Sequence, residues 1–134
     1  MDIRKTYVID AARDAVWKAL TDPKAIERWS GGPADMSAEP GSTFSLWDGS
    51  IFGTVIEVDP GRSMLQEWYG GNWDAPSLAR FTLSDDPGGA TRLEFENTAV
   101  PDEDGPDIDA GWDEYYLGPL KTLVEVGKSA RENR

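Results

Sequence analysis

VWKALTDPKAIERW, residues 16–29, is the stretch of sequence that decides the fold of this chain. Its apolar residues recur at helical spacing both before and after Thr21-Asp22-Pro23. This tripeptide ends one helix and begins the next, because aspartate is a favoured N-cap residue and proline suits the first helical turn. The stretch therefore predicts two short helices that meet at a proline corner.

Short strands with turn residues between them surround this pair of helices. The alternation of residues from Ile3 to Ile9 predicts a first strand. Turn pairs such as Asp48-Gly49 separate the later segments, and consecutive strands joined by short turns predict an antiparallel meander. Six further strands are expected after the helices, at residues 34–38, 42–47, 50–58, 62–69, 77–84 and 91–100.

The end of the chain carries the longest helical pattern. Apolar residues share one face of a helix expected over residues 110–132, with Asp109 as its N-cap and a bend at Pro119. The order of one strand, two short helices, about six strands and a long helix is an α+β layout. A curved antiparallel sheet wrapped around the long helix would bury that apolar face, which is the helix-grip arrangement.

Composition bounds the fold and excludes several classes of function. The chain has 134 residues, 39% of them hydrophobic, so we expect one packed domain over residues 1–134. It has no cysteine and no histidine, which excludes disulfides, thiol or histidine catalysis and the usual zinc sites, and we predict no metal and no cofactor. Its net charge of −12 argues against nucleic acid and anionic membranes as partners. Without an apolar segment long enough for a signal peptide or a membrane span, a cytoplasmic location is expected.

Further short segments extend the pattern of residues 16–29 over nearly the whole chain. They are, in order, Gly41 to Phe44, Asp48-Gly49, Gly53 to Pro60, Trp68, Thr91-Arg92-Leu93, Thr98 to Pro101, Gly111-Trp112 and Leu120. In this ordered set the chain resembles the activator of heat-shock-protein-90 ATPase homologue-like family, in its single-domain prokaryotic type, within the START/polyketide-cyclase superfamily. The resemblance implies a helix-grip fold of six to seven strands with a cavity between sheet and long helix. It also implies a stress-related role and a chaperone as a candidate partner.

The parity of each strand and helix predicts which side chains face the space between sheet and long helix. Most of them are aromatic or aliphatic, which favours a small apolar or aromatic ligand. The alternative is that the aromatic residues form the packed core and that the side-chain amides of Gln66 and Asn97 are hydrogen-bonded to neighbouring groups. The candidate cavity residues are Trp29, Phe44, Leu46, Gln66, Trp68, Phe81, Phe95, Asn97, Trp112, Tyr116 and Leu120. Trp47, at the end of its strand, and Trp73, in a turn, are candidates for a protein contact, for a lid or for ordinary packing.

Three functions remain open from the sequence. The first is a carrier or sensor of a small hydrophobic ligand, as a monomer or weak homodimer. The second is a co-chaperone-like module that binds a heat-shock-protein-90 homologue, as the family resemblance implies. The third, ranked last, is a cyclase- or hydrolase-type enzyme, which without histidine would depend on Glu57 or a tyrosine such as Tyr116. Glu57 becomes a catalytic candidate if its strand turns it inward, because burial raises the pKa of a carboxyl group.

Overall fold

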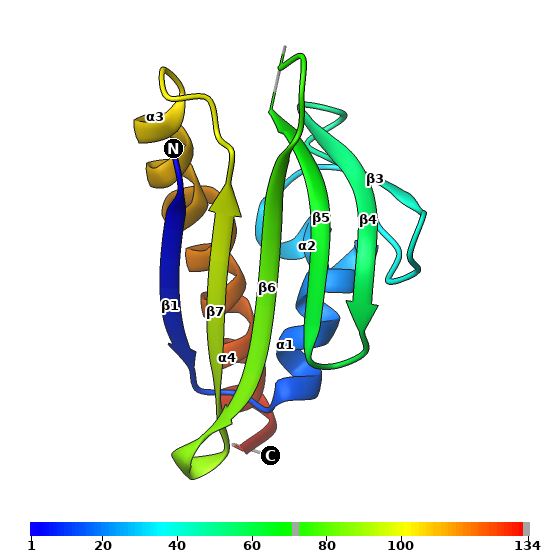
Figure 1. Ribbon diagram of the computed structural model, residues 1–134. Coiled ribbons are helices and arrows are strands. Elements are labelled where there is room, and N and C mark those ends of the chain that lie inside the picture. Colours follow the sequence, from blue (N-terminus) through cyan, green and yellow to red (C-terminus); the bar gives the residue numbers. More distant parts are fainter. Residues whose placement is uncertain (71–72, 133–134) are drawn as a thin grey trace.

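The computed structural model describes residues 1–70 and 73–132, and within them seven antiparallel strands form one sheet whose single covered face carries the helices (Figure 1). The predicted α+β helix-grip class is confirmed. The strands are β1 (Ile3–Ile9), β2 (Ala34–Asp35), β3 (Thr43–Leu46), β4 (Ile51–Asp59), β5 (Ser63–Gly70), β6 (Ser77–Asp86) and β7 (Ala90–Thr98), with a short 3₁₀ turn, η1 (Pro87–Gly89), between the last two.

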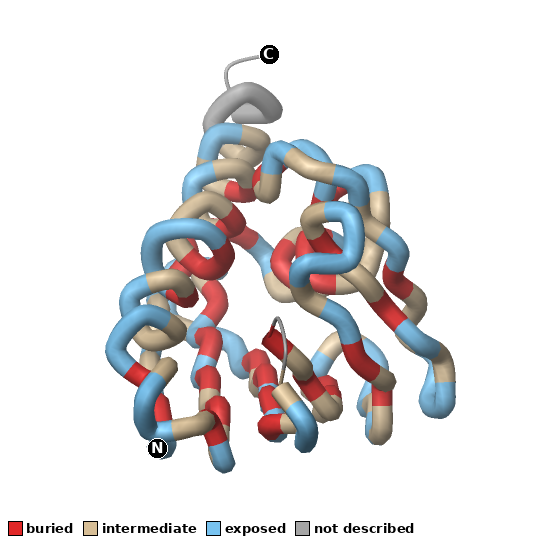
Figure 2. The backbone as a smooth tube through the Cα atoms, turned by 90° about the horizontal axis from the view of Figure 1, so that it is seen from above, coloured by how far each residue is buried: buried red, intermediate tan, exposed pale blue. Residues whose placement is uncertain are grey.

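The sheet order is β1-β7-β6-β5-β4-β3-β2, so the first strand pairs with the last one. Strands β2 to β7 follow one another as the expected meander. The helices α1 (Arg13–Thr21) and α2 (Pro23–Ser30) form the connection between the two edges of the sheet, from β1 to β2. Buried positions gather between the sheet and the helices, as the view along the strands shows (Figure 2).

The proline corner between α1 and α2 forms as the sequence predicts. The Asp22 side chain accepts a hydrogen bond from the backbone N–H of Lys24 at 3.2 Å, and Pro23 is the first residue of α2. The indole N–H of Trp29 donates to the carbonyl oxygen of Ala19 at 2.8 Å. Because both groups are buried, this bond fixes the angle between the two helices.

The terminal helix begins earlier than the sequence predicts and changes its pitch. It consists of α3 (Gly105–Gly111), a π-helical turn, η2 (Trp112–Leu117), and α4 (Gly118–Glu132). The prediction that Asp109 is the N-cap is wrong, because Asp104 occupies that position and Asp109 lies inside α3. Pro106 lies in the first helical turn of α3, where a missing N–H costs nothing.

The π-helical turn ends two residues before Pro119, the second proline of the terminal helix. Proline has no N–H to donate, and the wider turn lets Gly118 donate to the carbonyl oxygen of Asp113, five residues earlier. A Cβ atom on Gly118 would lie 2.3 Å from that oxygen. Glycine is therefore required at this position for steric reasons.

We predict opposite effects of alanine at two glycines of the terminal helix. Gly118→Ala places a methyl group against the Asp113 carbonyl and lowers the free energy of unfolding by about 1–3 kcal/mol. Gly127→Ala meets nothing within 4 Å and raises it by about 0.5–1 kcal/mol, because alanine is the better helix former. Urea unfolding followed by circular dichroism measures both values. Equal effects of the two substitutions would contradict a steric requirement at Gly118.

Candidate functional site

An apolar cleft of about 480 Å³ opens at the end of the molecule where α3 lies, between the terminal helix and the β3–β4 hairpin. Side chains from both sides of the interior meet there, and most of them are aromatic or aliphatic. The hairpin and β5 contribute Trp47, Ser50, Ile51 and Trp68, and the terminal helix contributes Asp107, Ile108, Gly111, Trp112, Tyr115 and Tyr116.

The hairpin wall depends on an uncommon backbone conformation at Trp47. Its φ of 51° lies in the left-handed region, which bulky residues rarely adopt. The indole N–H of Trp47 donates to the carbonyl oxygen of Ser30, the last residue of α2, at 2.9 Å. The ring also lies against Gly32, where a Cβ atom would come within 2.9 Å of it. The end of α2 therefore holds Trp47 in place as a wall of the cleft.

The helix wall is fixed by a buried network centred on Asn97. The indole N–H of Trp112 donates to Asn97 Oδ1 at 3.0 Å. Asn97 Nδ2 donates to Ser77 Oγ and to the carbonyl oxygen of Leu78, and Ser77 Oγ donates to the carbonyl oxygen of Trp68. The amide of Asn97 is thus fully engaged within the protein, and its contribution to the cleft is to orient Trp112.

Ring packing fills the interior beneath the cleft. The Trp112 ring lies 4.2 Å from Phe95, 4.9 Å from Trp68 and 4.7 Å from Tyr116, measured between centroids. The open volume therefore lies at one end of the space between sheet and helix.

All eleven predicted cavity residues are buried, but they occupy different places. Trp68, Trp112 and Tyr116 line the cleft. Trp29 lines a shallower groove on the other side of the terminal helix, next to Pro119. The remaining seven belong to the packed interior and are Phe44, Leu46, Gln66, Phe81, Phe95, Asn97 and Leu120.

Several cleft residues were not among the predicted ones. Ile108 was missed because the helix was expected to start after it, and Tyr115 because the apolar face was drawn through Trp112, Tyr116 and Leu120. The spacing of Ile108, Trp112 and Tyr115, at four and three residues, was the signal that would have found both. Trp47, for which the sequence allowed a protein contact, a lid or ordinary packing, lies in the wall of the cleft.

Glu57 is exposed on the outer face of the sheet, so the buried carboxylate considered from the sequence is not found. The register of β4 against β5 shifts between Val55 and Glu57, and this bulge reverses the parity of the strand. The Glu57 side chain is 66% exposed and lies 3.9 Å from Arg80.

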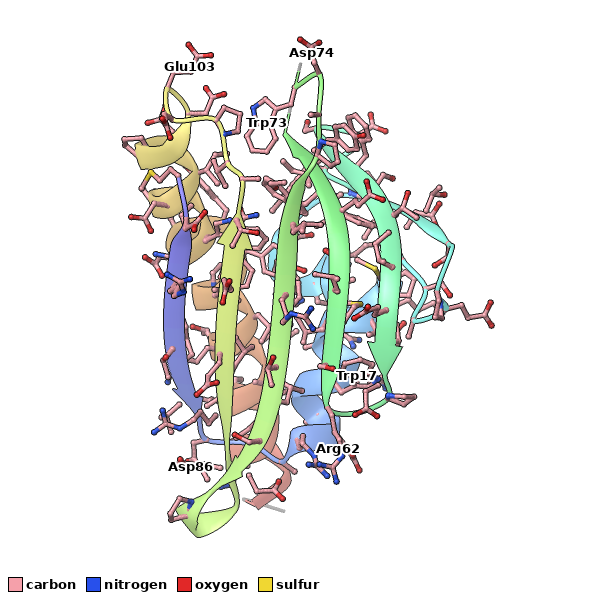
Figure 3. The ribbon with its side chains drawn as sticks, viewed as in Figure 1. Trp17, Arg62, Trp73, Asp74, Asp86 and Glu103 are labelled. Carbon is pink, nitrogen blue, oxygen red and sulfur yellow. The ribbon has the colours of Figure 1, made fainter. Side chains whose placement is uncertain are left out.

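Two polar contacts hold the terminal helix beside the cleft. The Trp73 indole N–H donates to Asp104 Oδ2 at 2.9 Å, and its ring packs edge-on against Trp68. Trp73 extends from the β5–β6 connection toward the segment that precedes α3 (Figure 3). On the β1 side, Lys5 Nζ donates to Asp113 Oδ2 at 2.8 Å.

The Lys5 contact extends to two further side chains and shifts three pKa values. Lys5 also pairs with Asp109, and the Tyr7 hydroxyl donates to Asp113. Burial opposes charge on both Lys5 and Asp113 and is the largest single influence on each. The hydrogen bonds and charges of Asp109 and Asp113 together outweigh it and raise the pKa of Lys5, and the hydrogen bonds from Lys5 and Tyr7, together with the Lys5 charge, lower the pKa of Asp113. Burial and the neighbouring carboxylate raise the pKa of Tyr7.

No group of acidic residues in the described part of the chain is arranged to hold a metal ion. Among the described residues, no helix is long and apolar enough to cross a membrane.

The lowered pKa of Asp113 predicts a loss of stability in acid. A carboxyl group with a depressed folded-state pKa stabilises the fold above its ordinary value of 3.8, and this contribution disappears as the pH falls through the lower folded-state value. Asp113→Asn should therefore lower the urea midpoint at neutral pH and have little effect below that range. Glu114→Gln removes the same charge one residue away and serves as the control. A pH-independent effect of Asp113→Asn would contradict the ionic contribution.

Comparison with known proteins places the chain in a family. Residues 10–125 match the family described as Activator of Hsp90 ATPase homolog 1-like protein. The mouse activator of 90 kDa heat shock protein ATPase homolog 2 is 25% identical over 122 residues, which cover 90% of this chain and 37% of that protein. The chain thus spans well under half the length of the curated relatives it matches.

Three solved structures share the fold. An Hsp90 activator from Plasmodium falciparum superposes with a TM-score of 0.85 at 22% identity, covering 92% of this chain and 95% of that chain. The Aha1 dimer from Colwellia psychrerythraea gives 0.81 at 19% identity, covering 96% and 98%. CalU16 from Micromonospora echinospora gives 0.75 at 29% identity, covering 92% and 72%.

Proposed function

We propose that this chain, which belongs to the Activator of Hsp90 ATPase homolog 1-like family, binds a small hydrophobic ligand in the cleft between the β3–β4 hairpin and the terminal helix. The observation that carries the proposal is the lining of the cleft. Three tryptophans and two tyrosines surround a volume of about 480 Å³, and small-molecule sites enclose about 300 to 1,000 Å³.

The walls of the cleft are set before a ligand arrives. Trp47 is held by the carbonyl oxygen of Ser30 and Trp112 by the amide of Asn97. A preorganised site binds more tightly, because fewer side chains lose conformational freedom on association. Tyr115 is the exception, since the residue is 60% exposed and its ring packs against no other aromatic ring among the described residues. It is the wall residue that adjusts most easily to a ligand.

A substitution that fills the cleft tests the proposal. Gly111 lines the cleft, and a Cβ atom there would make only an ordinary contact of 3.9 Å with Tyr115. Gly111→Leu should therefore fold at least as stably as the parent, because leucine favours helix over glycine, and should abolish binding by occupying the volume. Titration with the neutral fluorescent probe N-phenyl-1-naphthylamine measures the affinity.

Gly127→Leu is the matched control, because Gly127 lies on the same terminal helix away from the cleft and a Cβ atom there would meet nothing within 4 Å. It should leave the affinity for the probe unchanged. Saturable binding that survives Gly111→Leu would locate the site elsewhere, and the absence of saturable binding to the parent would refute the proposal.

A second candidate function is association with a heat-shock-protein-90 homologue. It is favoured by the mouse and human relatives, which are named activators of the 90 kDa heat shock protein ATPase and of which this chain matches less than half. With a net charge of −12, the chain would associate with a basic surface, and such contacts weaken as salt screens them.

For this second candidate we expect stimulation of the chaperone's ATPase at low salt and loss of that stimulation at high salt. Purified chain is added to the Hsp90 homologue of the same source, and ATP turnover is followed with and without an Hsp90 inhibitor. The Gly111→Leu variant should stimulate as well as the parent, because a protein contact does not need the cleft. Unchanged turnover at low salt, together with no co-sedimentation, would exclude this function.

A further inference from the structure

Two residues that line the cleft each carry a buried polar atom without a hydrogen-bond partner among the described residues. These atoms are Nε1 of Trp68 and the hydroxyl oxygen of Tyr116. An unpaired buried donor costs about 1–3 kcal/mol, so each such atom in a folded protein calls for an explanation. A ligand in the cleft that accepts a hydrogen bond would remove this cost.

Trp68 differs from the other buried tryptophans of the described chain, Trp29 and Trp112, whose indoles are hydrogen-bonded. The indoles of Trp29, Trp47, Trp73 and Trp112 all donate to an oxygen within 2.8–3.0 Å. Trp68 is as deeply buried as Trp112 and differs in having no such acceptor in the described part of the chain. An indole N–H can only donate, so the missing partner must be an acceptor.

The Tyr116 hydroxyl presents the same requirement. Burial raises its pKa, so the group stays protonated at neutral pH and is available as a donor. Its ring is fixed between Trp29, at 4.6 Å, and Trp112, at 4.7 Å, measured between centroids. The hydroxyl therefore cannot reach a distant protein acceptor without breaking this packing.

The charge of the lining restricts the ligand further. Asp107 is the single charged residue among those that line the cleft, and it lies exposed at the rim. On the β1 side, Lys5 is already paired with Asp109 and Asp113, and the N-terminal ammonium with Asp102. A carboxylate in the cleft would lose its hydration without gaining a counter-charge, and the net charge of −12 would oppose its approach.

On the basis of the proposed function, we infer that the ligand of this cleft is an uncharged, planar aromatic compound that carries a hydrogen-bond acceptor, and that carboxylates are excluded. The five aromatic side chains of the lining provide the stacking surfaces for such a ring system. Trp68 Nε1 and the Tyr116 hydroxyl are the donors to its acceptor. Both atoms are buried in the structure, so a ligand reaches them only when the aromatic wall rearranges, and Tyr115, at 60% exposure, is the lining aromatic residue with the most room to move.

Three probes of nearly equal shape test this inference by isothermal titration calorimetry at neutral pH. They are 2-acetonaphthone, which carries an acceptor, 2-ethylnaphthalene, which does not, and the anion 2-naphthoate. We expect the ketone to bind about three- to tenfold more tightly than the hydrocarbon, which is the range of one net hydrogen bond. The naphthoate should bind at least about tenfold more weakly than the ketone.

Two variants separate hydrogen bonding from ring packing. Tyr116→Phe and Trp68→Phe each remove a donor and keep an aromatic ring, so they should reduce the preference for the ketone while changing the affinity for the hydrocarbon less. Tyr116→Phe should also fold as stably as the parent, because the hydroxyl it removes is unpaired. Thermal unfolding of each variant without probe checks this.

The outcomes distinguish this inference from the function on which it rests. Equal affinities for ketone and hydrocarbon in the parent and both variants would overturn the inference and leave ligand binding intact. Naphthoate binding as tight as that of the ketone would overturn the exclusion of carboxylates. If none of the probes, nor N-phenyl-1-naphthylamine, binds saturably, the proposed function itself fails and the inference fails with it.

Discussion

The hydrogen bond from the Trp112 indole to the Asn97 amide holds the terminal helix against the sheet. Both residues are buried, so breaking the bond would leave a donor and an acceptor unpaired at a cost of about 1–3 kcal/mol each. Asn97 in turn donates to Ser77 Oγ, and Ser77 donates to the backbone of Trp68. One network thus links β5, β6, β7 and the helix, and it holds Trp68 and Trp112 beside each other in the lining of the cleft.

The terminal helix meets this constraint by widening one turn. In a regular α-helix, residues three and four apart share a face, whereas the wider turn of η2 brings residues four and five apart together. Trp112, Tyr116 and Leu117 are accordingly all buried, and Tyr115 is left exposed beside the cleft. The same wide turn accommodates Pro119. The single π-helical turn therefore compensates for the N–H that Pro119 lacks, and it also arranges the aromatic side chains of the helix along the cleft.

Local patterns predicted most elements of the fold because each of them is encoded within a few residues. The proline corner, the strand alternation and the Asp48-Gly49 turn are of this kind, and the structure has them all. What escaped prediction depends on contacts between distant segments. The bulge that turns Glu57 outward has no marker in its own strand, and the left-handed conformation of Trp47 is stabilised by a hydrogen bond to the end of α2. For the same reason the sequence predicted inward-facing aromatics but not which of them border open space.

The helical pair of residues 16–29 influences the cleft, although no residue of this pair is among the described residues that line the cleft. Trp29 ties α2 to α1 through the carbonyl oxygen of Ala19, and the next residue, Ser30, accepts the hydrogen bond that fixes Trp47. The Trp29 ring also packs against Tyr116 of the opposite wall. Because α2 contacts one wall through a hydrogen bond and the other through a ring, a shift of α2 would change both walls at once. The segment that decides the fold is therefore also the one that sets the width of the cleft.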